Sequence, residues 1–267
     1  MKKIVLGNEK IDIIGFGTYK MTDNDAEKAV LCALECGYRR IDTAIMYENE
    51  SGVGRAIGAS GLKRDELFVT TKLWTDVRSG DSAKAAVDGS LKRLKIDRID
   101  LLLIHWPTPD NDAVWAAMED MKEEGTVGHI GLSNFKPHHI EELKYRIKPE
   151  WDQIEMHPYF QNRETHEYLK SRGIVTEAWS PLLRGGTLGN EVVVALAKKY
   201  AATPAQIVLA FLTGEGVAVI PKSTDPEHIR TNLKAADLSL DPDDVAAMRA
   251  LDTGVRSFRD PDCHGFC

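Results

Sequence analysis

The stretch LFVTTKLWTDVRSGDSAKAAVDGSLKRLKIDRIDLLLIH, residues 67–105, decides the fold. It begins and ends with a short apolar run, at 67–73 and 99–105, and between these runs alanine, valine and leucine recur at the spacing of an amphipathic helix. A strand, a helix and a second strand in this order predict two parallel strands joined by a crossover helix. The number of such units along the chain therefore decides the architecture.

Eight units of this kind follow one another without a Pro/Gly/Ser-rich linker, which favours a closed (β/α)8 TIM barrel over an open doubly wound sheet. Residues 2–13 alternate around Gly7 and Asn8 and predict a β-hairpin ahead of the barrel. Two helical patterns, at 190–201 and 242–252, exceed the eight-unit count. We expect residues 1–267 to form a single domain. Strands are expected at 13–18, 39–44, 67–73, 99–105, 129–134, 152–157, 175–180 and 217–223.

The composition is that of a folded protein, with 43% hydrophobic and 28% charged residues. A net charge of −7 without a basic run argues against a nucleic-acid-binding surface, because neutralising phosphates requires clustered lysine and arginine. The N-terminus lacks the apolar region of a secretory signal, and no apolar run approaches the roughly 18 residues of a membrane span. The sequence therefore predicts a cytoplasmic protein with no membrane contact.

Four cysteines form two C-x3-C pairs, Cys32/Cys36 and Cys263/Cys267. A domain of this size needs no disulfide, so we expect a reducing compartment. His264 makes a metal site at the second pair conceivable, but structural zinc requires four ligands. A polar tail without a metal is the favoured interpretation.

Ionisable residues recur at the predicted strand ends, where TIM barrels place their chemistry. They are Asp42, Lys72 and His105, and Tyr47 follows in the loop after the second strand. Singly, each has a structural alternative as a loop cap, a solvated terminus or the partner of a carbonyl. Together, Lys72 would lower the pKa of Tyr47 from its usual value of about 10, and Asp42 would hold the lysine. His105 could then polarise a substrate carbonyl, so the group predicts a proton donor for carbonyl reduction.

The motifs around these residues resemble the successive signature segments of the aldo-keto reductases, from the hairpin to about residue 255, and most closely the B-type bacterial 2,5-diketo-D-gluconate reductases. The resemblance implies a tetrad of Asp42, Tyr47, Lys72 and His105, with Tyr47 as general acid and a nicotinamide cofactor as hydride source. It implies reduction of small aldehydes, ketones and dicarbonyls such as methylglyoxal or 2,5-diketo-D-gluconate. The motifs are GFGTYKM (15–21), RIDTAIMYENE (40–50), TTKLW (70–74), LLIHWP (102–107), GLSNF (131–135), DQIEMHPY (152–159) and IPKS (220–223).

The resemblance also assigns binding residues. Ser133, Asn134 and Gln153 would bind the nicotinamide carboxamide, and Trp179 would stack on the ring, with ordinary core packing as its alternative. The other implied cofactor contacts are Gly17, Thr18, Asp42, Ser180, Leu182, Lys222, Ser223, Thr224, His228 and Asn232. The substrate pocket would be bounded by Tyr19, Tyr47, Trp74, His105 and Trp106.

Phosphate recognition is expected where Lys222 meets the N-terminus of the following helix, whose amides attract anions. This favours NADP(H). His228 stands where the family commonly has arginine, and Thr231 replaces a common glutamate, so secondary use of NAD(H) is expected. The glycines of 52–58 lack the Rossmann spacing and are assigned to helix packing.

Two other functions stay open. One is a Schiff-base aldolase with Lys72 or Lys222 as nucleophile; the other is a regulatory subunit that binds nicotinamide but turns over slowly. The intact tetrad offers no reason to prefer the latter. The resemblance favours a monomer that acts on a small carbonyl compound, with the tail of residues 255–267 shaping an open pocket.

Overall fold

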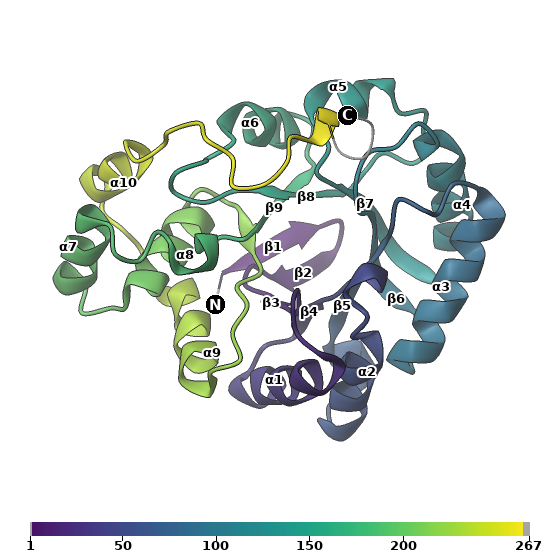
Figure 1. Ribbon diagram of the computed structural model, residues 1–267, viewed down its shortest axis with the longest axis horizontal. Coiled ribbons are helices and arrows are strands. Elements are labelled where there is room, and N and C mark those ends of the chain that lie inside the picture. Colours follow the sequence, from purple (N-terminus) through teal and green to yellow (C-terminus); the bar gives the residue numbers. More distant parts are fainter. Residues whose placement is uncertain (1, 264–267) are drawn as a thin grey trace.

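Eight parallel strands form one sheet in the computed structural model, which describes residues 2–263 (Figure 1). Each strand pairs with its neighbour in chain order, and a parallel bridge between Ile14 and Val219 joins the first edge to the last. The Gly15 N–H donates to the Val219 carbonyl at 2.8 Å across the same join. The sheet thus closes, and the predicted (β/α)8 barrel is confirmed. The strands are β3 (Phe16–Gly17), β4 (Arg40–Asp42), β5 (Phe68–Leu73), β6 (Ile99–Ile104), β7 (Val127–Ser133), β8 (Trp151–Glu155), β9 (Val175–Trp179) and β10 (Ala218–Val219).

The predicted N-terminal hairpin is present as β1 (Lys3–Leu6) and β2 (Glu9–Asp12), which pair antiparallel. Gly7 in its turn has φ +58°, a conformation that glycine adopts without steric cost. Glu9 lies 3.4 Å from the ring of His129 in the early part of β7. The hairpin therefore lies at the amino-terminal ends of the strands, opposite the end that carries the predicted site.

Helices surround the barrel, as Figure 1 shows. The two surplus helices predicted from the sequence are α7 (Glu191–Lys199) and α10 (Pro242–Arg249). The others are α1 (Asp23–Cys36), α2 (Glu50–Ala59), α3 (Gly80–Leu94), α4 (Asn111–Glu123), α5 (Pro137–Glu142), α6 (Arg163–Ser171), α8 (Pro204–Gly214) and α9 (Pro226–Leu233). Short 3-10 turns lie at Ile45–Tyr47, Arg64–Glu66, Leu183–Gly185, Lys234–Asp237 and Pro261–Cys263.

The glycines of α2 allow close helix packing. A Cβ on Gly52 would come within 1.9 Å of the Asp23 carbonyl oxygen, and one on Gly54 within 2.5 Å of the Leu94 carbonyl oxygen. Because backbone cannot withdraw as a flexible side chain can, only glycine fits at these positions. The assignment to helix packing is confirmed for Gly52 and Gly54, whereas a Cβ on Gly58 would meet nothing within 4 Å.

Cys32 and Cys36 are half-buried in α1, and Cys263 is exposed. The second predicted cysteine pair is Cys263/Cys267. Cys267 and the neighbouring His264 lie outside the described residues. Within residues 2–263, no single helix is long and apolar enough to cross a membrane; α7 and α8 pass that test only together, as a pair bent by 91°.

Candidate active site

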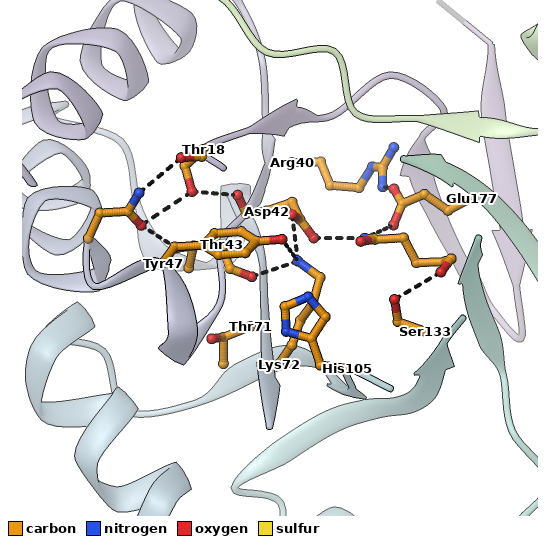
Figure 2. A network of polar contacts seen from close by, with 12 residues as sticks. Thr18, Arg40, Asp42, Thr43, Tyr47, Thr71, Lys72, His105, Ser133 and Glu177 are labelled. Carbon is orange, nitrogen blue, oxygen red and sulfur yellow. Dashed lines mark hydrogen bonds and ion pairs between the residues drawn. The ribbon is translucent and has the colours of Figure 1, made fainter. Parts of the chain in front are cut away.

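Lys72 on β5 joins Asp42 at the end of β4 to Tyr47 in the following turn (Figure 2). Its ammonium donates to Asp42 Oδ1 at 2.7 Å, to the Thr43 carbonyl at 2.8 Å and to the Tyr47 hydroxyl at 3.3 Å. Asp42 and Lys72 are buried. An ammonium whose three N–H bonds are engaged offers no lone pair, so the geometry opposes a Schiff-base role for Lys72.

His105 follows β6 and faces the same group. Its ring centroid lies 5.6 Å from that of Tyr47 and 5.0 Å from that of Trp74. Its backbone is held on both sides, since its N–H donates to the Leu73 carbonyl at 3.0 Å and its carbonyl accepts from Asn134 Nδ2 at 3.0 Å. The four predicted tetrad residues therefore come together at the carboxyl ends of neighbouring strands.

The pKa of Tyr47 differs from the expectation. Burial, and after it the negative charge of Asp42, raise the pKa of the phenol well above its ordinary value. The prediction of a phenol pKa lowered from its usual value is therefore wrong, because the burial of the phenolate outweighs the attraction of the Lys72 ammonium at 3.3 Å. Burial likewise raises the pKa of Asp42, although Lys72 opposes this. Tyr47 consequently holds its proton at neutral pH.

The residues predicted to contact the nicotinamide lie on three neighbouring strands. Ser133 and Asn134 stand at the end of β7, Gln153 in the middle of β8 and Trp179 at the end of β9. Ser133 Oγ donates to the backbone carbonyl of Gln153 at 2.9 Å. The indole N–H of Trp179 donates to Asn134 Oδ1 at 2.8 Å. Trp179 is only partly buried. Its hydrogen bond fixes the ring while part of it stays accessible, an arrangement compatible with stacking on a planar ligand.

Gln153 supplies the polar group most suited to an amide ligand. Its Nε2 donates to Asp42 Oδ2 and to Glu177 Oε2, both at 2.8 Å. Within residues 2–263, no hydrogen bond reaches its Oε1. The site therefore retains an acceptor that fits the N–H of a nicotinamide carboxamide.

Gly17 and Thr18 have structural partners. A Cβ on Gly17 would lie 2.9 Å from the Ile220 carbonyl oxygen, so glycine is required where β3 meets the strand that closes the barrel. The buried hydroxyl of Thr18 donates to the Asp42 carbonyl at 3.0 Å. Asn49 ties the same loops together, donating to the Thr18 carbonyl at 2.9 Å and accepting from Thr43 Oγ1 at 2.8 Å.

The predicted phosphate site differs from the expectation at α9. The first amides of this helix, those of Glu227 and His228, donate to Asp225 Oδ1 at 2.8 and 3.1 Å. These hydrogen bonds lower the pKa of Asp225, which therefore stays ionised at neutral pH. The helix N-terminus expected to attract phosphate is occupied by a side-chain carboxylate.

The remaining predicted cofactor residues differ in their exposure. Lys222, Thr224 and His228 are exposed, and Ser223, Ser180 and Leu182 are partly exposed. Asn232, the expected adenine contact, is buried. In the part of the chain that the structure describes, no acidic group pairs with the ammonium of Lys222, so its charge is available to an anion.

The predicted aromatic wall is present. Tyr19 is exposed with its ring 5.0 Å from that of Tyr47, and Trp74 borders His105. Trp106 packs against Phe258 of the C-terminal tail, with 5.8 Å between the ring centroids. Phe258 also contacts Trp179 edge-on, with 6.1 Å between the ring centroids. The tail thus contributes an aromatic residue to the mouth of the barrel.

Comparison with known proteins agrees with this geometry. Residues 7–253 match the family described as Aldo/keto reductase family. The chain belongs to the aldo-keto reductases. Methylglyoxal reductase DkgA of Yersinia pestis is 41% identical over 259 residues, which cover 94% of this chain and 93% of that protein.

Solved structures agree with the family. The aldo-keto reductase MGS-M4 from a Medee basin deep-sea metagenome library has a TM-score of 0.95 at 41% identity, covering 97% of this chain and 98% of that one. A mutant of Gox0644 in complex with NADPH has a TM-score of 0.94 at 35% identity, covering 99% of this chain and 98% of that one.

The sequence interpretation missed several residues around the site of this aldo-keto reductase: Arg40, Asn49, Glu177 and Phe258. Arg40 and Glu177 stand inside the predicted strands 39–44 and 175–180. A charged residue inside a buried strand requires a partner of opposite charge. The sequence pattern of these two strands therefore did indicate a buried ion pair. No local signal indicates which groups Asn49 and Phe258 contact.

Proposed function

We propose that the protein reduces small aldehydes, ketones and dicarbonyls, such as methylglyoxal or 2,5-diketo-D-gluconate, to alcohols with NADPH. The proposal rests on the Lys72 ammonium, which contacts both Asp42 and Tyr47 beside His105. A relative named methylglyoxal reductase and a structural neighbour in complex with NADPH support it. The proposal includes a monomeric cytoplasmic enzyme whose residues 1–267 act as one domain.

The four residues of the tetrad have different roles in the proposed reaction. When bound, NADPH supplies the hydride that the carbonyl carbon accepts. Tyr47, which holds its proton because of its raised pKa, donates that proton to the substrate oxygen. Lys72 stabilises the phenolate that remains, and Asp42 holds Lys72 in place. His105 orients and polarises the carbonyl.

The cofactor would be held at both ends. Ser133, Asn134 and Gln153 would bind the carboxamide, and Trp179 would stack on the ring. Lys222 would pair with the 2′-phosphate, and the charge of Asp225 would oppose it. We therefore propose a modest preference for NADPH with measurable use of NADH.

The decisive experiment is Tyr47→Phe, assayed by loss of NADPH absorbance with methylglyoxal. We expect kcat to fall by about 10²-fold or more, because the lost proton transfer belongs to the transition state, with cofactor affinity nearly intact. Tyr145→Phe, which changes an exposed tyrosine, serves as the control. More than about a tenth of the original kcat in Tyr47→Phe would refute the assignment.

The same preparation tests the other two functions. A lysine adduct trapped by borohydride would indicate an aldolase, and NADPH binding without turnover of any carbonyl compound would indicate a regulatory subunit. We expect neither result.

A further inference from the structure

Gln153 lies between two carboxylates in the barrel interior. Its Nε2 is 2.8 Å from Asp42 Oδ2 and 2.8 Å from Glu177 Oε2, so its two N–H bonds point to two acceptors. Because an ionised carboxylate only accepts hydrogen bonds, the nitrogen and not the oxygen of the amide must face these neighbours. The two carboxylates together determine which way round the Gln153 amide lies.

Glu177 on β9 is itself fixed. One of its carboxylate oxygens accepts from the Arg40 guanidinium, and the other accepts from the indole N–H of Trp151 at 3.1 Å. Arg40 also donates to the carbonyls of Asp12 and Ile13, both at 2.9 Å. Arg40, Trp151 and Glu177 are fully buried, so water does not compete for these bonds.

Glu177 makes no direct contact with the other three tetrad groups. Among the described residues, no hydrogen bond or ion pair joins it to Lys72, Tyr47 or His105, and its hydrogen-bonded connection to Asp42 runs through Gln153. Its negative charge also helps to raise the pKa of Asp42 and of Tyr47. Without an acceptor at Glu177, the Gln153 amide would keep one carboxylate partner, and its nitrogen and oxygen could exchange places by rotation of the side chain. Its Oε1 would then no longer be presented as the free acceptor.

We propose that Glu177, held by Arg40, is a positioning residue that orients the Gln153 amide so that Oε1 accepts from the nicotinamide carboxamide. This inference rests on the proposed function, because it requires a nicotinamide cofactor. It assigns the buried Arg40–Glu177 pair a role in cofactor affinity in addition to joining the strands.

The variant Glu177→Gln tests the orientation at nearly constant volume. Arg40 will attract the carbonyl oxygen of the new glutamine, so the NH2 group of that glutamine will face Gln153. The two NH2 groups, one at 177 and one on Gln153, then repel each other because neither can accept a hydrogen bond. In Arg40→Met/Glu177→Gln the guanidinium is gone, so the amide at 177 can turn its oxygen back to Gln153 and Trp151. The double variant should therefore rescue the single one.

Two further variants keep the test decisive. Glu177→Asp keeps a negative charge opposite Arg40, but its side chain is one methylene shorter, so its carboxylate oxygen lies farther from Gln153. This variant takes the place of Glu177→Gln if Glu177→Gln fails to fold. Glu119→Gln is the control, since Glu119 is a buried carboxylate paired with Arg146 outside the barrel interior.

The readout is the dissociation constant, measured by calorimetry, for NADPH and for adenosine 2′,5′-bisphosphate, which lacks the nicotinamide. Glu177→Gln should weaken NADPH binding about tenfold, the effect of one lost hydrogen bond, and leave the bisphosphate unchanged. Arg40→Met/Glu177→Gln should recover to within about threefold of the original NADPH affinity. Glu119→Gln should bind both ligands normally.

Unchanged NADPH affinity in Glu177→Gln and Glu177→Asp would overturn the inference. Equal weakening of both ligands would do the same, because it would indicate a structural role alone. If the unmodified protein binds NADPH no more tightly than the bisphosphate and reduces no carbonyl compound, the proposed function itself fails. The two failures are thus distinguishable.

Discussion

Tyr47 is the residue whose surroundings most affect the proposed chemistry. Its hydroxyl lies 3.3 Å from the Lys72 ammonium, yet burial and the charge of Asp42 raise the pKa of the phenol well above its usual value. Lys72 therefore does not poise a half-ionised tyrosine. In the proposed mechanism, Lys72 stabilises the phenolate only after the proton has left.

The raised pKa has a direct consequence for the pH dependence. A phenol with a raised pKa stays protonated through neutral and mildly alkaline pH, so carbonyl reduction should stay nearly constant between about pH 7 and 9. Oxidation of the alcohol with NADP+ needs the phenolate and should accelerate over the same range. Steady-state kcat in both directions measures this. A fall in reduction centred near pH 7 would contradict it.

At the scale of single elements, Glu150 links β7, β8 and α4. It accepts from Lys122 on α4 at 2.8 Å, from the Ile130 N–H at 3.2 Å and from the His129 ring at 3.0 Å. Burial alone would raise the pKa of Glu150, but these partners outweigh it and lower the pKa to about 2. Burial alone would lower the pKa of His129, but Glu150 outweighs it and the pKa is raised.

Glu150→Gln should lower the free energy of unfolding at pH 6 by about 2 kcal/mol. A lowered carboxyl pKa contributes stability above the unfolded value of 4.5, and that stability is lost as the pH falls towards about 2. The His129 contribution, with its raised pKa, is complete below 6.5 and is lost at higher pH. Urea unfolding at pH 6 and 3 measures the difference, which should shrink at pH 3. The exposed Glu124→Gln is the control.

The N-terminus of α9 should control the choice of dinucleotide. Asp225 accepts hydrogen bonds from two helix amides and carries a negative charge three positions after Lys222, where we propose the 2′-phosphate binds. Asp225→Ser keeps an N-cap oxygen but removes the charge, so the ratio of kcat/KM for NADPH to that for NADH should rise several-fold. His228→Arg should raise it further by adding a permanent charge. An unchanged ratio in both variants would mean that other residues bind the phosphate.

At the scale of the whole molecule, Arg40 joins the start of the barrel to its end. Its guanidinium donates to the Ile13 carbonyl at 2.9 Å and to the Val219 carbonyl at 3.1 Å, across the seam where the sheet closes. The strands pair there through few residues, since β3 and β10 have two residues each. The buried cation therefore reinforces a weakly paired seam.

Arg40→Met alone should lower the free energy of unfolding by about 3–5 kcal/mol, because it leaves the carboxylate of Glu177 buried without its cation. Arg40→Met/Glu177→Gln should regain much of this loss, because the uncompensated charge is gone. Arg39→Met is the control. It changes the half-buried neighbour, whose guanidinium donates to the Leu34 and Tyr38 carbonyls and to no other group among residues 2–263. Equal stability of Arg40→Met and the unmodified protein, by thermal unfolding, would contradict this account.

Local patterns in the sequence were enough to predict the barrel. Apolar runs such as 67–73 and 99–105 and the helical spacing between them depend on residues close in the chain, so their period could be read directly. The strand order then brought Asp42, Lys72 and His105 to one end, because parallel strands finish at the same face. The fold and the tetrad geometry required no knowledge of side-chain contacts.

The pKa shifts of these groups, and the contacts that hold them, could be known only from the packing of distant segments. Gln153 meets Asp42 across 111 positions of the chain and Arg40 meets Glu177 across 137, and nothing local to either residue specifies such a contact. The pKa of Tyr47 was predicted in the wrong direction because its sign depends on burial, a property of the assembled barrel. Sequence periodicity therefore defined the elements, whereas the packing of distant segments defined the electrostatics of the site.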